Sequence, residues 1–201
     1  MEKTFKQILE GYRLFQEKYV QGDNTILRSL SKHGQKPQIM LIACCDSRVD
    51  PALILQCDPG DLFVVRNVAN IVPPYQKDEA LHGTSAALEF GVCLLQVRHL
   101  ILLGHSQCSG VAAALTQQLE KNDFISHWVS TIQRENNEIT DPDEYAKAAL
   151  MISYENCLTF PWIKQRMAEN NLLIHRWFFD IKKGQIFTYS DVYELYQALE
   201  L

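Results

Sequence analysis

Short apolar runs that alternate with helical patterns constrain the fold of this chain more than any other feature. Most of the runs have the length and apolar character of strands buried on both faces, and they lie at 38–44, 62–65, 99–104, 172–181 and 185–189. In much of the remaining chain the apolar residues recur with the spacing of a helix. These segments lie at 3–20, 78–97, 108–119, from 144 onward and in the tail from 191. Strands that alternate with helices predict an α/β fold, with a mostly parallel central sheet flanked by helices.

Composition supports a globular protein with one core. The chain has 201 residues, of which 47% are hydrophobic and 21% are charged, and this balance is typical of folded rather than disordered proteins. No internal repeat, low-complexity segment or linker divides the sequence. We therefore expect a single domain over residues 1–201.

Charge and hydropathy exclude two classes of partner. The 19 basic and 24 acidic residues give a formal net charge of −5, which lacks the basic footprint of a nucleic-acid-binding protein. No apolar run approaches the roughly 20 residues that a membrane span needs. Residues 1–16 (MEKTFKQILEGYRLFQ) are charged and amphipathic, unlike a signal peptide. We expect no nucleic acid, no membrane and a cytoplasmic location.

Two polar clusters directly follow two of the predicted buried strands. Residues 44–48 read CCDSR, and residues 104–108 read GHSQC. Ligands of open parallel sheets bind at the carboxyl edge of the strands, where the ends of neighbouring strands meet. The two clusters are therefore expected to meet at one edge, although they lie far apart in the sequence.

The side chains in these clusters are those of a zinc site. Cys44, His105 and Cys108 would supply two thiolates and one imidazole, and three protein ligands leave a fourth tetrahedral position for water. Asp46 and Arg48 lie beside the first ligand and can form a bidentate pair that orients the carboxylate near that water. The alternatives are that the cysteines are packed apolar thiols and that the acid and base form an ordinary surface ion pair.

The sequence resembles the β-class carbonic anhydrases in three ordered motifs. That family shows C-x-D-S-R, R-N-x-A-N and G-H-x-x-C-G-G, and this chain has CCDSR at 44–48, RNVAN at 66–70 and GHSQCSG at 104–110. The likeness runs from the N-terminal helix through residues 180–182. Residues 34–37 (GQKP), 70–74 (NIVPP) and 158–161 (LTFP) are similar to the plant-type branch of the family.

The resemblance implies an activity, a cofactor and a set of site residues. The activity is the reversible hydration of CO2 to bicarbonate and a proton, through attack of zinc-bound hydroxide on CO2. One Zn²⁺ per chain would be held by Cys44, His105 and Cys108, with Asp46 and Arg48 as the catalytic pair. The substrate-binding residues would be Gln35, Phe63, Val68, Phe90, Ser109 and Gly110.

The resemblance also implies an oligomer. In the family some pocket residues come from a second subunit, so we expect a homodimer or a higher even oligomer, with an N-terminal helical arm that packs on the dimer partner.

Two positions depart from the family pattern. Phe90 stands where plant-type enzymes usually have Tyr, so the apolar wall remains without a hydroxyl, and Ser109 replaces the first Gly of C-G-G, which narrows the allowed backbone angles there.

Two other functions fit the same residues. The fold and ligands would also serve a hydrolase of a related linear molecule such as CS2 or COS, and comparing the turnover of CO2 with that of CS2 separates these activities. A non-enzymatic structural-zinc or redox protein is the other alternative.

The remaining thiols, at Cys45, Cys57, Cys93 and Cys157, are expected to be buried core residues.

Overall fold

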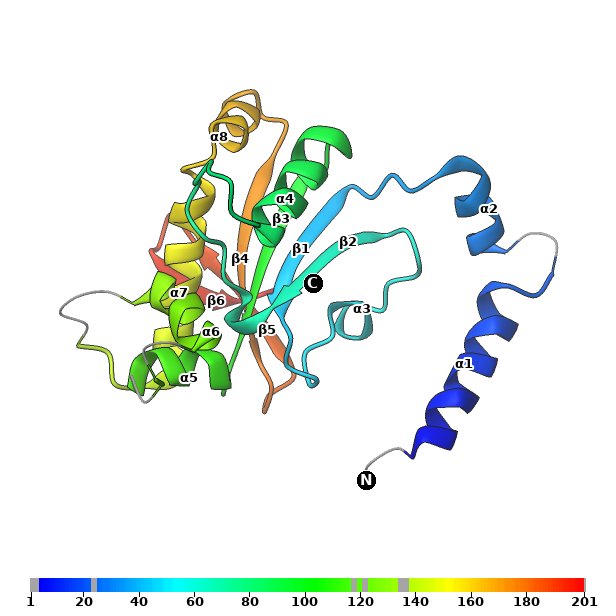
Figure 1. The fold of residues 1–201 in the computed structure, drawn as a ribbon, viewed down its shortest axis with the longest axis horizontal. Helices are drawn as coiled ribbons and strands as arrows, with labels where there is room; N and C mark the ends of the chain where they lie inside the picture. The colour runs from blue at the N-terminus through cyan, green and yellow to red at the C-terminus, as the bar shows by residue number, and fades with distance from the viewer. Residues whose placement is uncertain (1–3, 23–24, 117–118, 121–122, 134–137, 201) are drawn as a thin grey trace.

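A six-stranded mixed sheet organises the computed structural model, which describes residues 4–22, 25–116, 119–120, 123–133 and 138–200. The strands lie in the order β2-β1-β3-β4-β5-β6 (Figure 1). The first four are parallel, and β5 and β6 are added antiparallel at one edge. Their bounds are β1 Ile39–Cys44, β2 Leu62–Asn67, β3 His99–His105, β4 Leu173–Asp180, β5 Gln185–Ser190 and β6 Leu195–Ala198. This arrangement confirms the predicted α/β class.

The described helices fall between the strands and before them. Their bounds are α1 Phe5–Tyr19, α2 Ile26–His33, α3 Pro51–Ile54, α4 Gly83–Glu89, α5 Ser109–Thr116, α6 Phe124–Val129, α7 Pro142–Cys157 and α8 Pro161–Ala168, with short helical turns at Val68–Asn70, Phe90–Leu94 and Ser130–Ile132. Asp50 and Asp141 cap α3 and α7 by accepting backbone N–H groups, and each precedes a proline at the first helical position. None of the described helices is long and apolar enough to cross a bilayer.

Alternation along β1 divides the core between the two faces of the sheet. Met40 and Ile42 point into the larger cluster, which includes Leu88 of α4 and Leu150 of α7. Leu41 points to the opposite face, into a small cluster of four buried residues. All of these strand residues are fully buried, which explains why the run reads as continuously apolar in the sequence.

The N-terminal arm, which we define as α1 and α2, contains no buried residue. Figure 1 shows both helices standing apart from the sheet. Leu14 is exposed on the opposite side of α1, but the other exposed apolar side chains of the helix share one side and are Phe5, Ile8, Leu9, Tyr12 and Phe15. Contact with the rest of the chain includes the Tyr19 hydroxyl, which donates to Asp58 Oδ1 over 2.6 Å.

Two predicted helices differ from the structure. The helix expected over 78–97 begins only at Gly83 and changes at Phe90 into a π-helical turn. The tail from 191, expected to be helical, instead forms strand β6. Tyr196 of β6 stands opposite Tyr189 of β5, with ring centroids 5.3 Å apart, and such cross-strand aromatic pairs stabilise an antiparallel edge over the local helical preference.

Gly104 provides a stability test of the packing behind the predicted metal ligands. A Cβ at this position would lie 2.8 Å from Cδ1 of Leu150, which is fully buried and cannot move aside. Gly104→Ala should therefore lower the free energy of unfolding by about 1–3 kcal/mol, measured by urea denaturation at a fixed protein concentration. Gly83→Ala is the control because no atom lies within 4 Å of its added Cβ. Equal denaturation midpoints for the two variants would contradict this account.

Candidate metal centre

The ends of β1 and β3 bring the three predicted metal ligands together. Cys44 and His105 are the last residues of these adjacent parallel strands, and Cys108 directly precedes α5. Their candidate ligand atoms all lie within 4.8 Å of one another, and the two Sγ atoms are 3.8 Å apart. All three side chains are buried. The geometry therefore assembles the Cys-His-Cys group predicted from the sequence.

His105 has the orientation of a metal ligand. Its Nδ1–H donates to the Ser106 carbonyl oxygen over 2.8 Å, which leaves the lone pair on Nε2. That Nε2 atom is buried and has no hydrogen-bond partner among the described residues. A buried nitrogen without a partner is unfavourable unless something binds it, so this atom fits a coordinated metal ion.

The two thiols fit a divalent cation on electrostatic grounds. The hydrogen bond from Cys108 lowers the pKa of the Cys44 thiol, and the resulting anion raises the pKa of Cys108. The pair alone therefore keeps one proton between two sulfurs. Nearby backbone N–H groups act to lower the pKa of both thiols, those of Asp46 and Ala69 at Cys44 and those of Gly110 and Val111 at Cys108. These donors support negative charge on both sulfurs, and a bound cation would allow both to be thiolates.

Asp46 and Arg48 form the predicted bidentate pair beside this group. Arg48 Nε donates to Asp46 Oδ1 over 2.9 Å, and Nη2 donates to Oδ2 over 2.7 Å. The Arg48 side-chain hydrogen bond holds the pKa of the Asp46 carboxyl well below its usual range. Arg48 Nη2 also donates to the Gln107 carbonyl oxygen over 3.1 Å, which connects the motif after β1 with the motif after β3. Asp46 is therefore an oriented anion at the edge of the site.

The predicted substrate residues fall into two groups in the structure. Val68, Ser109 and Gly110 lie at the metal group, and α5 packs so closely that a Cβ on Gly110 would meet Val68 Cγ1 at 2.6 Å. Phe63 and Phe90 stack on each other with ring centroids 5.6 Å apart.

The second group lies away from the metal group of its own chain. Phe63 pairs in register with Met40, four residues before Cys44, which is roughly 13 Å along the strands. Gln35 is exposed in the segment that precedes β1. The structure does not bring Gln35, Phe63 and Phe90 to the Cys-His-Cys group within one chain.

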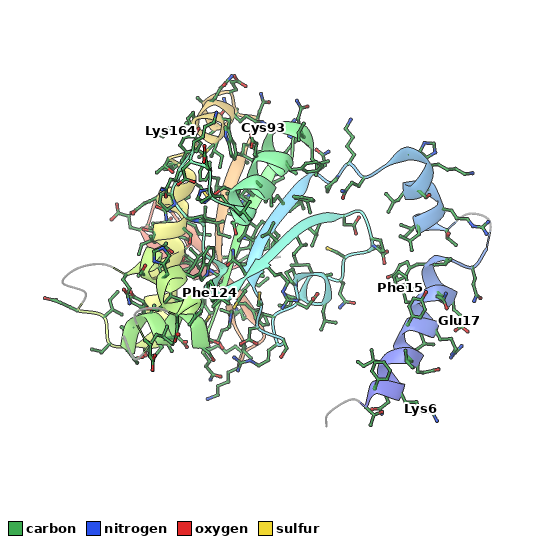
Figure 2. All side chains as sticks on the ribbon, viewed as in Figure 1. Lys6, Phe15, Glu17, Cys93, Phe124 and Lys164 are labelled. Atoms are coloured by element: carbon green, nitrogen blue, oxygen red, sulfur yellow. The ribbon has the colours of Figure 1, made fainter. Side chains whose placement is uncertain are left out.

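An apolar pocket lies beside Val68. Its volume is about 420 Å³, and its lining residues are Asn67, Val68, Phe124, Ile125 and Trp128. Figure 2 labels Phe124, whose side chain is 99% exposed at the start of α6. The surroundings of Val68 are thus largely apolar.

Two supporting residues were not assigned a role from the sequence. Arg66 donates from Nε to the Cys44 carbonyl oxygen and from Nη2 to the Asp46 carbonyl oxygen, over 2.9 and 2.7 Å. Its place in the RNVAN motif was the available signal. Trp128 donates from Nε1 to the Val68 carbonyl oxygen over 2.8 Å, and no sequence pattern indicated this contact.

The remaining thiols differ in part from expectation. Cys157 is buried as predicted, and Cys57 is partly buried. Cys45 and Cys93 are exposed, so their assignment to the core was wrong. Cys45 directly follows β1, where the chain leaves the sheet and its side chain is no longer covered by the facing helices.

Sequence comparisons identify relatives over nearly the whole chain. A family profile described as carbonic anhydrase matches residues 39–186. A carbonic anhydrase of Synechocystis sp. is 32% identical over 93% of this chain and 72% of that protein. The beta carbonic anhydrase 3 of Arabidopsis thaliana is 31% identical over 94% of this chain and 77% of its own length. The plant relative is consistent with the plant-type branch.

Solved structures agree with these relatives. The β-carbonic anhydrase CcaA is 32% identical, and it superposes with a TM-score of 0.84 over 98% of this chain and 92% of that one. One of two tetrameric β-carbonic anhydrases from Sordaria macrospora gives a TM-score of 0.73 at 32% identity, over 91% and 92% of the two chains. From the assembled motifs, the profile match and these relatives, we conclude that the chain belongs to the β-carbonic anhydrase family.

Proposed function

We propose that Cys44, His105 and Cys108 bind one zinc ion per chain, and that Asp46 and Arg48 act beside it in the reversible hydration of CO2 to bicarbonate and a proton. The hydration reaction is that of the family to which the chain belongs. One observation carries the residue assignment: a buried group of two thiols and a histidine with an unpartnered Nε2 adjoins an oriented Asp–Arg pair. A purely structural zinc site would have no use for that pair.

The donor set suits zinc chemically. Thiolate and imidazole match the borderline softness of Zn²⁺, and three protein ligands leave one position open. When bound, the ion acts as a Lewis acid that lowers the pKa of a coordinated water and makes a nucleophile available near neutral pH.

Asp46 would orient that nucleophile by accepting a hydrogen bond from it. Because Arg48 binds both carboxylate oxygens, the carboxylate keeps its charge and one fixed direction. Arg66 fixes the peptide backbone that carries Asp46, so the acid is held through both its side chain and its main chain. Val68 and Gly110 form the nearby wall against which CO2 would lie.

We propose that a second subunit completes the pocket. Gln35, Phe63 and Phe90 lie away from the Cys-His-Cys group of their own chain, so they would serve the site of a partner in a homodimer or a higher even oligomer. The exposed apolar side of α1 offers a surface for that contact. The related enzymes from Sordaria macrospora are tetrameric, which agrees with an even assembly.

Adjacent cysteines provide a matched test of the metal ligands. Cys44→Ser should lose zinc because a serine hydroxyl does not replace a thiolate, and the zinc content is measured by elemental analysis of purified protein. Cys45→Ser is the control because its exposed thiol lies outside the group. Stoichiometric zinc in Cys44→Ser would refute the assignment of this ligand.

Asp46→Asn tests the role of the carboxylate separately from metal binding. We expect full zinc content but a fall in kcat/KM for CO2 hydration of about 100-fold, measured by stopped flow. The reason is that the neutral amide carries no charge and does not accept the hydrogen bond of the nucleophile in the same way. Glu169→Gln is the control because this exposed carboxylate at the end of α8 has only local hydrogen-bond partners among the described residues, Gln165 and Asn171, and it should keep normal turnover. Normal turnover in Asp46→Asn would reject the catalytic role.

Charges placed on the apolar side of α1 test the shared pocket. The double variant Leu9→Asp, Phe15→Asp should shift the protein to monomers in sedimentation, since burying these charges in an interface is unfavourable. Each monomer should retain zinc but lose most of its CO2 hydration. Lys6→Asp, on the polar side of the same helix, is the control for added charge (Figure 2). Fully active monomers would contradict the proposal.

A further inference from the structure

The peptide unit between Ser106 and Gln107 lies in the turn that carries two predicted metal ligands, and it is bound at both of its polar ends. Its carbonyl oxygen accepts the Nδ1–H of His105 over 2.8 Å. Its N–H, which belongs to Gln107, donates to Oδ1 of Asp143 over 2.7 Å. Asp143 lies in the first turn of α7. One peptide plane therefore connects a carboxylate on α7 with the imidazole of a predicted metal ligand.

The polarity of this chain of hydrogen bonds suits a metal ligand. The negative charge of Asp143 lies at the N–H end of the peptide and makes the carbonyl oxygen at the other end a stronger acceptor, because hydrogen bonds joined through one amide polarise each other. A carbonyl oxygen only accepts, so the imidazole of His105 keeps its proton on Nδ1 and its lone pair on Nε2. A partner on the second ring nitrogen orients a histidine ligand and makes it more basic. Asp143 therefore favours the form of His105 that binds a cation.

The backbone of the turn has an unfavourable conformation. Gln107 has φ 56°, in the left-handed region that residues other than glycine rarely adopt. Rotating the plane of the peptide before it by about 180° would take this φ out of that region. The same rotation would turn the Ser106 carbonyl oxygen away from His105. The observed orientation therefore needs support from outside the turn.

The neighbouring contacts of the turn act on other peptide planes. The N–H of Ser106, in the preceding plane, donates to the Phe179 carbonyl oxygen over 3.0 Å. The carbonyl oxygen of Gln107, in the following plane, accepts from Arg48 Nη2 over 3.1 Å. These bonds fix the position of the turn on both sides. The bond to Asp143 acts on the N–H of the plane itself, so it favours the orientation in which the opposite carbonyl oxygen faces the imidazole.

We infer that Asp143 is a positioning residue for the metal centre, whose carboxylate holds the 106–107 peptide in the orientation that binds the Nδ1–H of His105. The inference rests on the proposed zinc site. It makes the first turn of α7 a support for a metal ligand, although the Cys-His-Cys group contains no residue of that helix.

Asp143→Ala removes the acceptor. Loss of a residue that supports a metal ligand typically weakens metal binding by about 10- to 100-fold, and we expect about 10-fold because Asp143 acts through a peptide. Zinc affinity is measured by competition between the zinc-loaded protein and a chromophoric chelator. Glu144→Ala is the matched control because it removes the next acid of the same helical turn, whose carboxylate accepts from Lys147. An affinity of Asp143→Ala within twofold of the control would overturn the inference.

Two further comparisons separate this hydrogen bond from the stability of α7. Asp143→Asn keeps an acceptor oxygen, so its zinc affinity should lie closer to that of the unchanged protein than the affinity of Asp143→Ala does. In a Gln107→Gly background the left-handed backbone costs little, so Asp143→Ala should lower the affinity by a smaller factor than it does with Gln107 in place. An Asn variant that binds no better than the Ala variant, or an equal factor in both backgrounds, would contradict the inference.

The imidazole proton gives a readout that a purely structural role of Asp143 would not move. In the zinc-loaded protein with isotope-labelled histidine, the Nδ1–H resonance of His105 reports the strength of its hydrogen bond. This resonance should shift upfield in Asp143→Asn and further in Asp143→Ala, and it should stay in place in Glu144→Ala. The Asn variant keeps this test available if the Ala variant folds poorly. An unchanged resonance in Asp143→Asn would overturn the inference.

Failure of the inference can be told from failure of the zinc site itself. If Cys44→Ser loses zinc while Asp143→Ala binds it as tightly as Glu144→Ala, the inference is wrong and the metal centre stands. If Cys44→Ser retains stoichiometric zinc, the metal centre is wrong and the inference falls with it.

Discussion

Parallel hydrogen bonding between β1 and β3 is the interaction on which the chemistry of this chain depends. The pairing runs from Ile39 with His99 to Ala43 with Leu103, so both strands end at the same edge of the sheet. That shared end brings a thiol and an imidazole to one place, and the turn after β3 returns a second thiol to it. A register shift of one residue in either strand would turn its ligand to the opposite face.

Hydrogen bonds then stabilise negative charge at this edge. Nearby backbone N–H groups act to lower the pKa of both thiols, and Arg66 donates to the carbonyl groups on either side of Cys45. Arg48 holds Asp46 and also contacts the turn that carries Gln107. These contacts hold the Cys-His-Cys group in place, so the metal binding that we propose would need little reorganisation.

Within one chain, the same fold keeps the predicted substrate residues Gln35, Phe63 and Phe90 away from the Cys-His-Cys group. Phe63 and Phe90 belong to the opposite end of the strands from Cys44, and the apolar side of α1 is exposed in the part of the chain that the structure describes. Both features have one explanation if the chain works as a dimer, because a second subunit would bury the arm and supply the missing wall. Stability, assembly and activity would then be coupled, since association that covers the arm also completes the site.

The sequence by itself determined the α/β class, the strands that carry Cys44 and His105, and the grouping of Cys44, His105 and Cys108. It could do so because buried parallel strands are continuously apolar and because ligand residues follow their ends directly. Tertiary structure alone decided that the tail is strand β6 rather than a helix, that Cys45 is exposed, and that Trp128 donates to the Val68 carbonyl oxygen. These outcomes depend on contacts between segments far apart in the chain, and such contacts leave no periodic pattern in either segment.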